Sequence, residues 1–219
     1  MRTSFEIGLR EMNDSLVKMG EMVNNAISNA MEALLTKDVK LAKMVIVGDA
    51  EINDLERKIE NQCLKLFMKQ QPVASDLRLV SSALKMVTDL ERIGDQAADI
   101  SELVLGLIED NRQYTPDDLG SIVAMSELAK DMVGKSIEAF VNYDLDIAYR
   151  VISMDDKVDA YYEKVKEEVV QDIKNEEHSP NALVDFILIA KYLERIGDHA
   201  QNIGEWVVYS ITGEMKKED

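Results

Sequence analysis

The sequence has little of several residue types, and each shortage excludes something. Its single cysteine, Cys63, excludes a disulfide framework within the chain and a zinc site built from cysteines, and we expect it to be a small core residue. Three prolines and 5% aromatic residues disfavour a sandwich or barrel. Apolar runs such as FILIA are too short to span a bilayer, and no apolar N-terminal segment follows Met1 and Arg2. We therefore expect a cytoplasmic, all-helical protein.

Positive charge is scarce as well. The 219 residues contain 25 Lys and Arg against 42 Asp and Glu, which gives a formal net charge of −17. Nucleic acids and anionic lipid surfaces are bound mainly through clustered basic side chains, so this balance argues against both partners. We expect no direct membrane insertion. An acidic surface suits cations and basic protein partners.

What the sequence does contain is helical periodicity. Apolar residues recur at spacings of three and four along most of the chain, as they do between residues 9 and 34. Thr115 and Ser179 each precede a proline, and Asp38 and Asp144 stand at similar breaks, so all four are expected helix caps. The pattern predicts six helices, near residues 3–36, 38–68, 74–109, 116–142, 144–175 and 180–212.

The chain also repeats itself. MEALLTKDVKLAKMVIVGD (31–49) aligns with IEAFVNYDLDIAYRVISMD (137–155) at an offset of 106. LERIGDQAADI (90–100) aligns with LERIGDHAQNI (193–203) at an offset of 103. Such repetition indicates two copies of one three-helix unit. We therefore predict an all-α fold of two tandem three-helix bundles, residues 1–110 and 111–219, packed side by side or end to end.

Each ERIGD segment carries two carboxylates four residues apart, where like charges destabilise a helix by a few tenths of a kcal/mol. Helical geometry places Glu91 and Asp95 roughly opposite the apolar stripe that starts at Leu90, and Glu194 and Asp198 do the same in the second copy. We therefore expect an acidic ridge outside each bundle. An ordinary solvated face is the simple interpretation, and gene duplication alone could retain it. A bound cation is the other interpretation, because it would cancel the repulsion.

The second helix of each unit adds oxygen ligands. Asp155 and Asp159 lie at the flank of its apolar stripe, where they would face a neighbouring helix, and Asp49 and Asn53 occupy the aligned positions. Carboxylates on adjacent helices suit magnesium, manganese or iron. The candidate metal ligands are therefore Asp49, Glu91, Asp95, Asp155, Asp159, Glu194 and Asp198.

Arg92 and Arg195 stand between these acids. We expect them to pair with Asp95 and Asp198 three residues further along each helix. Contact with a partner protein is the second interpretation of both arginines.

No residue pattern gives a positive reason to predict an enzyme. The chain has no Glu-x-x-His motif, and nothing resembles a Ser–His–Asp or Cys–His constellation or a nucleotide fingerprint. His178, in the connector NEEHSP, is expected to be a solvated loop residue. His199 aligns with Gln96 in the first copy, so we expect no shared ligand role for it.

The segments KQQPVASDLRLVSSALKMVTDLERIGDQAADI (69–100) and ALVDFILIAKYLERIGDHAQNIGEWVVY (182–209) resemble the two signature segments of the PhoU family of phosphate-transport regulators. The resemblance covers essentially the whole chain. It implies a regulator of phosphate uptake that keeps phosphate-starvation signalling off when phosphate is plentiful. It further implies an adaptor, often a homodimer, between the ATPase subunit of a phosphate ABC transporter and a phosphate-sensing histidine kinase.

The same resemblance implies bound metal ions, iron or zinc, on motifs of the form E/D-x-x-x-D. These motifs fall on Glu91/Asp95, Glu194/Asp198 and Asp155/Asp159, whereas Asn53 replaces the second acid of the remaining motif. We therefore expect the two sites to differ in affinity or nuclearity. Two alternatives stay open: a metal-dependent enzyme with an exposed carboxylate cluster, and a metal-free structural helical adaptor.

Overall fold

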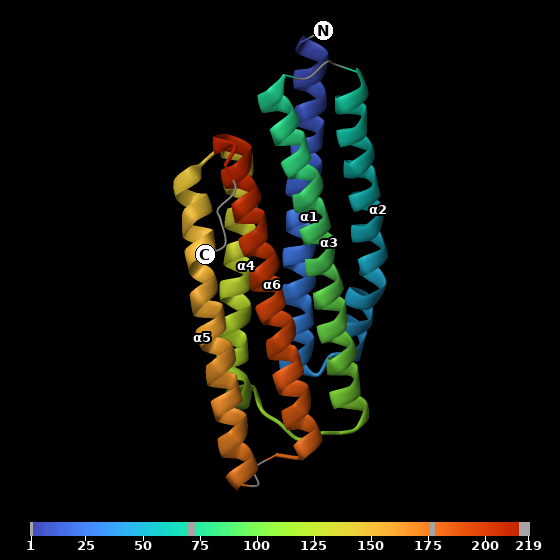
Figure 1. Ribbon diagram of the computed structural model, residues 1–219. Helices are drawn as coiled ribbons and strands as arrows, with labels where there is room; N and C mark the ends of the chain where they lie inside the picture. The colour runs from blue at the N-terminus through green and yellow to red at the C-terminus, as the bar shows by residue number, and fades with distance from the viewer. Residues whose placement is uncertain (1, 70–72, 176–177, 215–219) are drawn as a thin grey trace.

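The computed structural model describes residues 2–69, 73–175 and 178–214, and its described residues form helices and connections without strands (Figure 1). This confirms the all-α prediction. The one departure is in the fourth expected helix, which opens with a 3₁₀ turn before continuing as an α-helix. The elements are α1 (Arg2–Thr36), α2 (Val39–Lys69), α3 (Ala74–Glu109), η1 (Pro116–Leu119), α4 (Gly120–Asn142), α5 (Leu145–Asn175) and α6 (Pro180–Thr212).

Side chains fix where several helices begin. The Asp38 carboxylate accepts hydrogen bonds from the backbone N–H groups two and three residues further on, at 2.8 and 3.1 Å. Asp144 and Ser179 each accept one from the N–H group three residues on, at 2.9 and 3.3 Å. These bonds satisfy N–H groups that have no partner within the helix, and each cap contributes about 1 kcal/mol. The expected caps at these three positions are confirmed.

Two three-helix bundles lie side by side, which decides between the two packings left open by the sequence. Helices α3 and α6 are neighbours along the middle of the molecule and run in opposite directions (Figure 1). Helices α2 and α5 flank them, while α1 and α4 pack against each other and against the helices of their own bundles. The antiparallel α3–α6 pair therefore relates the two repeats by an approximate twofold rotation.

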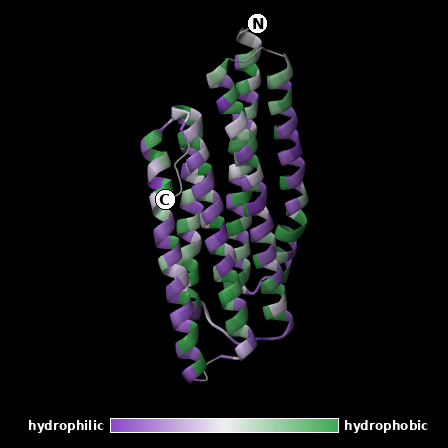
Figure 2. Ribbon diagram, viewed as in Figure 1, coloured by the Kyte–Doolittle hydropathy of each residue, from purple (hydrophilic) through white to green (hydrophobic). Residues whose placement is uncertain are grey.

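The predicted apolar stripes form the core. Leu90, Ile93 and Ile100 of α3 and Leu193 and Ile196 of α6 are fully buried. Hydrophobic and hydrophilic residues alternate along every helix, as amphipathic bundle helices require (Figure 2).

Cys63 is buried too, with its sulfur 3.5 Å from that of Met12, so its assignment to the core is confirmed. Among the described residues, no helix is both long enough and apolar enough to cross a membrane.

Candidate functional site

The predicted ligand residues gather along two helix seams. Asp49 on α2 lies beside the ERIGD segment of α3, and Asp155 on α5 lies beside that of α6. We call the α2–α3 group the first carboxylate cluster; it comprises Asp49, Asn53, Glu56, Glu91 and Asp95. The α5–α6 group is the second carboxylate cluster; it comprises Asp155, Asp159, Glu194 and Asp198.

The glycine of each ERIGD segment makes these seams tight. A Cβ atom on Gly94 would lie 3.0 Å from the side chain of Ile52 and 3.4 Å from Oδ1 of Asp49. A Cβ atom on Gly197 would lie 3.0 Å from Val158 and 3.2 Å from Oδ1 of Asp155. The glycines therefore let a carboxylate of the neighbouring helix approach the backbone of α3 or α6. This role was not foreseen from the sequence, although the recurrence of Gly at one offset was its signal.

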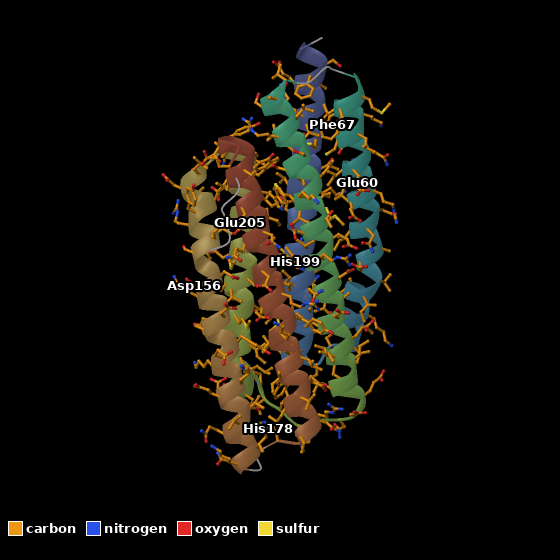
Figure 3. All side chains as sticks on the ribbon, in the orientation of Figure 1. Glu60, Phe67, Asp156, His178, His199 and Glu205 are labelled. Atoms are coloured by element: carbon orange, nitrogen blue, oxygen red, sulfur yellow. The ribbon has the colours of Figure 1, made fainter. Side chains whose placement is uncertain are left out.

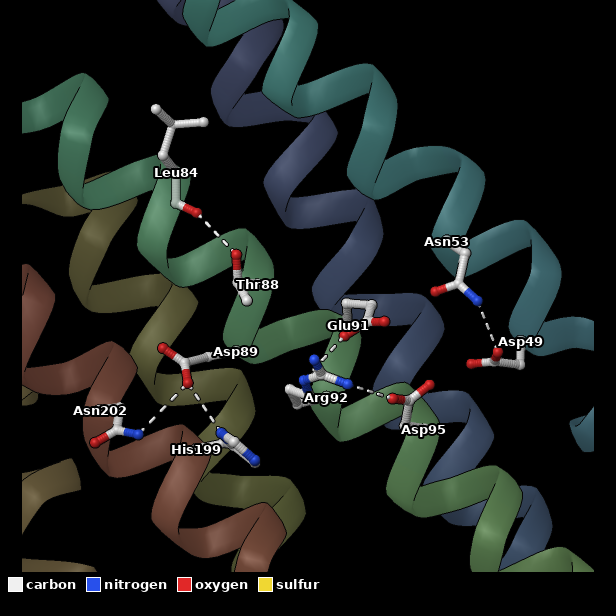
Figure 4. Close-up of polar contacts among 10 residues, drawn as sticks. All are labelled: Asp49, Asn53, Leu84, Thr88, Asp89, Glu91, Arg92, Asp95, His199 and Asn202. Carbon is white, nitrogen blue, oxygen red and sulfur yellow. Dashed lines mark hydrogen bonds and ion pairs between the residues drawn. The ribbon is translucent and has the colours of Figure 1, made fainter.

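In the first carboxylate cluster, Asp49 Oδ2 accepts a hydrogen bond from Asn53 Nδ2 at 2.8 Å (Figure 4). Asp49 Oδ1 and Asn53 Oδ1 are buried and have no hydrogen-bond partner among the described residues. Arg92 lies 3.5 Å from a Glu91 oxygen and 3.1 Å from an Asp95 oxygen. The expected pairing of Arg92 with Asp95 is thus confirmed.

Electrostatics in this cluster disfavour full ionisation. Burial, and then the Asp95 carboxylate, raise the pKa of Asp49 above its ordinary value. The same two causes raise the pKa of Glu91, with further contributions from Glu56 and Asp49, while Arg92 opposes them. Carboxylates from two helices therefore act on one another across the α2–α3 seam. Glu56, whose pKa burial also raises, was not among the predicted ligands.

The second carboxylate cluster is more strongly perturbed. Asp155 is only 9% exposed, and its Oδ1 has no hydrogen-bond partner among the described residues. Burial, followed by the carboxylates of Asp198 and Asp159, raises the pKa of Asp155 to about 7. Burial and Glu194 also raise the pKa values of Asp159 and Asp198. Glu194 forms an ion pair with Lys191.

The ridge outside each bundle was therefore only partly right. Asp198 is exposed, but the side chains of Glu91 and Glu194 are just 17% and 14% exposed. Asp155, which was predicted to face a neighbouring helix, is buried beside Gly197 of α6. The reason is the close approach of the helices at the two glycines, which turns a helix flank into a seam. A helical projection of one isolated helix does not contain this information.

The expected pair of Arg195 with Asp198 was wrong. Within the described residues Arg195 forms no ion pair with Asp198; its charge instead lowers the pKa of Asp99 on α3, although burial raises that pKa overall. Arg195 thus acts across the α3–α6 contact.

The prediction for His178 was wrong, and the main contact of His199 was not predicted. His178 is not a solvated loop residue: its side chain is 10% exposed, with Nε2 3.2 Å from Asp118 and Nδ1 3.4 Å from Asp172. The His178 ring packs edge-on against Phe186 near one end of the molecule (Figure 3).

His199 lies in the middle of the molecule instead (Figure 3). Its Nδ1 lies 2.9 Å from Asp89 Oδ1, which also accepts a weaker hydrogen bond from Asn202 at 3.4 Å (Figure 4). This contact joins the two bundles across α3 and α6. This contact was not predicted from the sequence, because Asp89 and His199 are 110 positions apart.

The donor set fits an oxygen-preferring cation in composition. Carboxylate and amide oxygens are the ligands of hard and borderline metal ions, and the buried Asp oxygens without partners would be satisfied by one. In the part of the chain that the structure describes, however, no three His, Cys, Asp or Glu side chains are already arranged around a common metal position. Metal binding therefore stays a prediction.

The described residues thus form six α-helices in two matching, oppositely directed halves, each with a carboxylate seam, and this arrangement is that of a duplicated helical protein. A family model described as "PhoU domain" matches the chain twice, at residues 16–104 and 122–207. The chain belongs to the PhoU family, as its two signature segments indicated.

Individual relatives match over nearly the full length. The chain is 38% identical over 215 residues to the "phosphate-specific transport system accessory protein PhoU homolog" of Clostridium acetobutylicum, which covers 98% of this chain and 97% of that protein. The homolog so named in Pseudomonas aeruginosa is 34% identical over 95% of this chain and 86% of its own length.

Solved structures agree. Crystal structures of PhoU from Pseudomonas aeruginosa and of the phosphate transport system regulatory protein PhoU from Streptococcus pneumoniae match with TM-scores of 0.89 and 0.88. Their sequence identities are 34% and 32%; 96% and 98% of this chain is covered, and 100% of each of those chains.

Proposed function

We propose that this protein is an accessory regulator of a phosphate-specific transport system, and that it represses phosphate-starvation signalling when phosphate is plentiful. The observation that carries this proposal is the match over 98% of the chain with a relative named as an accessory protein of that system. The family model also matches both repeats, and the matched residues, 16–104 and 122–207, contain both ERIGD segments of this chain. The relatives are named as accessory proteins and not as enzymes.

The finer part of the proposal is a metal-binding adaptor. Asp49, Glu91 and Asp95 would hold an ion in the first carboxylate cluster, and the four acids of the second cluster would hold another; iron or zinc is proposed, with magnesium or manganese as alternatives. A bound cation would neutralise mutually repelling oxygens. Support comes from the buried, unpartnered oxygens of Asp49 and Asp155 and from the raised pKa values around them.

The adaptor would work in the cytoplasm, as a homodimer. Its exposed acids, with Arg92 and Arg195 among them, would dock basic surfaces of the transporter's ATPase subunit and of the phosphate-sensing histidine kinase. Charge complementarity of this kind sets partner choice and association rate more than affinity.

The metal part is tested by elemental analysis of protein purified without chelator or His-tag. We expect a transition metal in the native protein, and a rise in Tm when the chelated protein is given iron or zinc. The double variant Asp155→Asn, Asp198→Asn should lose the rise contributed by the second cluster, whereas Asp54→Asn, on the exposed outer face of α2, should keep it. A metal-free native protein with no cation-dependent Tm would favour the structural adaptor.

The adaptor part is tested by pull-down with the ATPase subunit and the kinase, alongside a reporter of regulon repression. Reversing the charges of Glu91, Asp95, Glu194 and Asp198 should weaken both associations and release repression. Reversal of exposed acids on α4, Glu127 and Asp131, is the matched control. Intact associations and repression in the four-residue variant would show that the clusters are not the docking surface. A turnover screen in which Glu194→Gln abolishes an activity of metal-loaded protein would favour the enzyme alternative.

A further inference from the structure

One end of the first bundle combines exposed apolar side chains with basic ones. The start of α1, the end of α2 and the start of α3 project past the neighbouring ends of α5 and α6 (Figure 1). Large apolar side chains are exposed there: Ile7 (51%) on α1, and Leu64 (50%) and Met68 (84%) on α2. We call this end, together with Lys58 and Lys65, the first-bundle tip. Exposed apolar side chains grouped at a protruding end indicate a contact surface.

A groove of about 520 Å³ runs between α1 and α2 at the first-bundle tip. Lys58 and Lys65 line it from α2, and Glu11 is the acidic residue among its described lining residues. Neither lysine forms an ion pair within the described part of the chain, although the protein carries an excess of acids. Two uncompensated ammonium groups in a groove favour an anionic partner.

Basic and apolar side chains share the same outward face of α2. Leu64 and Met68 are four residues apart, and Lys65 and Met68 are three apart, so all three lie on adjacent positions of the helix surface. Lys58, seven residues before Lys65, continues the basic edge along the groove. Lysines beside exposed apolar side chains supply the two attractions that hold a surface on an anionic membrane, which are electrostatic attraction to the headgroups and burial of apolar area.

The duplication supplies an internal comparison. Residues 58–85 carry five Lys and Arg against two Asp and Glu, whereas the equivalent residues 164–188 carry three against six. The equivalent groove between α4 and α5 is lined by Asp117, Asp118, Glu168 and Asp172, with Lys164 as its basic residue. The second hairpin also exposes apolar side chains, Val170 and Ile173. The two ends thus share apolar character and differ in the sign of their charge.

We propose that the first-bundle tip docks on the surface of an anionic lipid bilayer. Lys58 and Lys65 bind headgroup phosphates, while Ile7, Leu64 and Met68 enter the boundary between headgroups and acyl chains. The net charge of −17 argued against such binding for the chain as a whole, but surface charges act over only about 8 Å at physiological ionic strength. The local balance of charges at the first-bundle tip, and not the net charge of the chain, therefore determines whether this end binds an anionic bilayer.

Vesicle co-sedimentation of the full chain tests this proposal without any transporter or kinase, so its outcome is independent of the proposed function. Vesicles of phosphatidylcholine are compared with vesicles containing phosphatidylglycerol. We expect binding to the anionic vesicles only, weakened by salt. The double variant Lys58→Glu, Lys65→Glu should bind at least roughly tenfold more weakly, since each lysine near an anionic surface contributes about fivefold.

Matched variants come from the second repeat. Leu64→Gln should weaken vesicle binding several-fold, while Val170→Gln, at the aligned position of α5, should not; Lys164→Glu, aligned with Lys58, should also leave binding unchanged. All these side chains are exposed, so helical content and Tm should stay at the unsubstituted values.

Three results would overturn the proposal. The first is no preference for anionic vesicles. The second is equal loss of binding from the variants of the two ends. The third is displacement by inorganic phosphate that exceeds displacement by chloride at equal ionic strength, because the groove would then hold a free anion and not a lipid surface.

Discussion

The buried carboxyl of Asp155 is the residue that departs furthest from its ordinary chemistry. It is enclosed between α5 and α6, beside Gly197, with one oxygen that no described hydrogen-bond donor reaches. Its ionised form is disfavoured first by burial and then by the neighbouring carboxylates of Asp198 and Asp159. In the absence of a cation, ionisation of Asp155 therefore destabilises the folded protein as the pH rises.

The stability of metal-free protein should depend on pH through Asp155. Its pKa is about 7 in the folded state against 3.8 for an ordinary aspartate, so between these values the folded state holds a proton that the unfolded state has lost. Stability from this group is present at low pH and is lost as the pH rises from about 4 to 7, by at most about 4 kcal/mol.

Urea unfolding in chelator, from pH 4.5 to 8, should therefore show a smaller decline for Asp155→Asn than for the unsubstituted protein. Asp54→Asn, at an exposed position of α2, is the control and should follow the unsubstituted protein. If the free energy of unfolding declines equally with pH in the protein and in its Asp155→Asn variant, Asp155 is not the source of the pH dependence.

At the scale of elements, the close spacing of neighbouring helices brings the residues of the two carboxylate clusters together. Asp49 and Asp155 are candidate ligands only because α2 and α5 come close to the ERIGD segments of α3 and α6. Glycine at these two points lowers helix propensity by about 1 kcal/mol relative to alanine, so its presence in mid-helix reflects the packing that it allows.

Substitution of Gly197 by Ala should destabilise the protein. The added Cβ would lie 3.0 Å from Cγ1 of Val158, a side chain with restricted χ1, and 3.2 Å from Asp155 Oδ1. Overpacking of this kind should outweigh the gain in helix propensity and lower the free energy of unfolding by roughly 1–2 kcal/mol.

The matched control is Gly48→Ala on α2, where a Cβ meets nothing within 4 Å. It should raise the free energy of unfolding by about 0.5–1 kcal/mol. Effects of the same sign in the two variants, measured by urea titration, would show that Gly197 is not a spacing residue.

At the scale of the whole molecule, the two repeats complete each other. Helix α3 packs along α6, and Asp89 meets His199 and Asn202 across that contact. Helices α3 and α6 are copies of one helix and run in opposite directions. In the full chain α6 buries one surface of α3, and α3 buries the equivalent surface of α6.

Residues 1–110 expressed alone should therefore form a homodimer, in which α3 pairs with α3 of a second copy in place of α6. Light scattering coupled to size exclusion would measure this. Addition of residues 111–219 should convert it to a heterodimer, because the Asp89–His199 contact is available only there. A stable monomer of residues 1–110 would contradict the interdependence of the two bundles.

Sequence patterns predicted most of this fold correctly. Apolar spacing and the two internal offsets were sufficient for six helices, their approximate ends and the repeated bundle. The buried state of His178 was missed, because one of its partners, Asp118, lies in the distant η1 segment. Arg195 was predicted to pair with Asp198 on its own helix, whereas its charge acts on Asp99 of α3.

The amino-acid sequence by itself determined the helices, the core stripes, the acidic excess and the family, since these follow from local periodicity and residue identity along one chain. Only the tertiary structure decided that the bundles lie side by side in opposite directions, that Asp155 is buried and that the basic end of the first bundle protrudes. These features depend on distances between helices far apart in the chain, and such distances are set by packing at a few points such as Gly94 and Gly197.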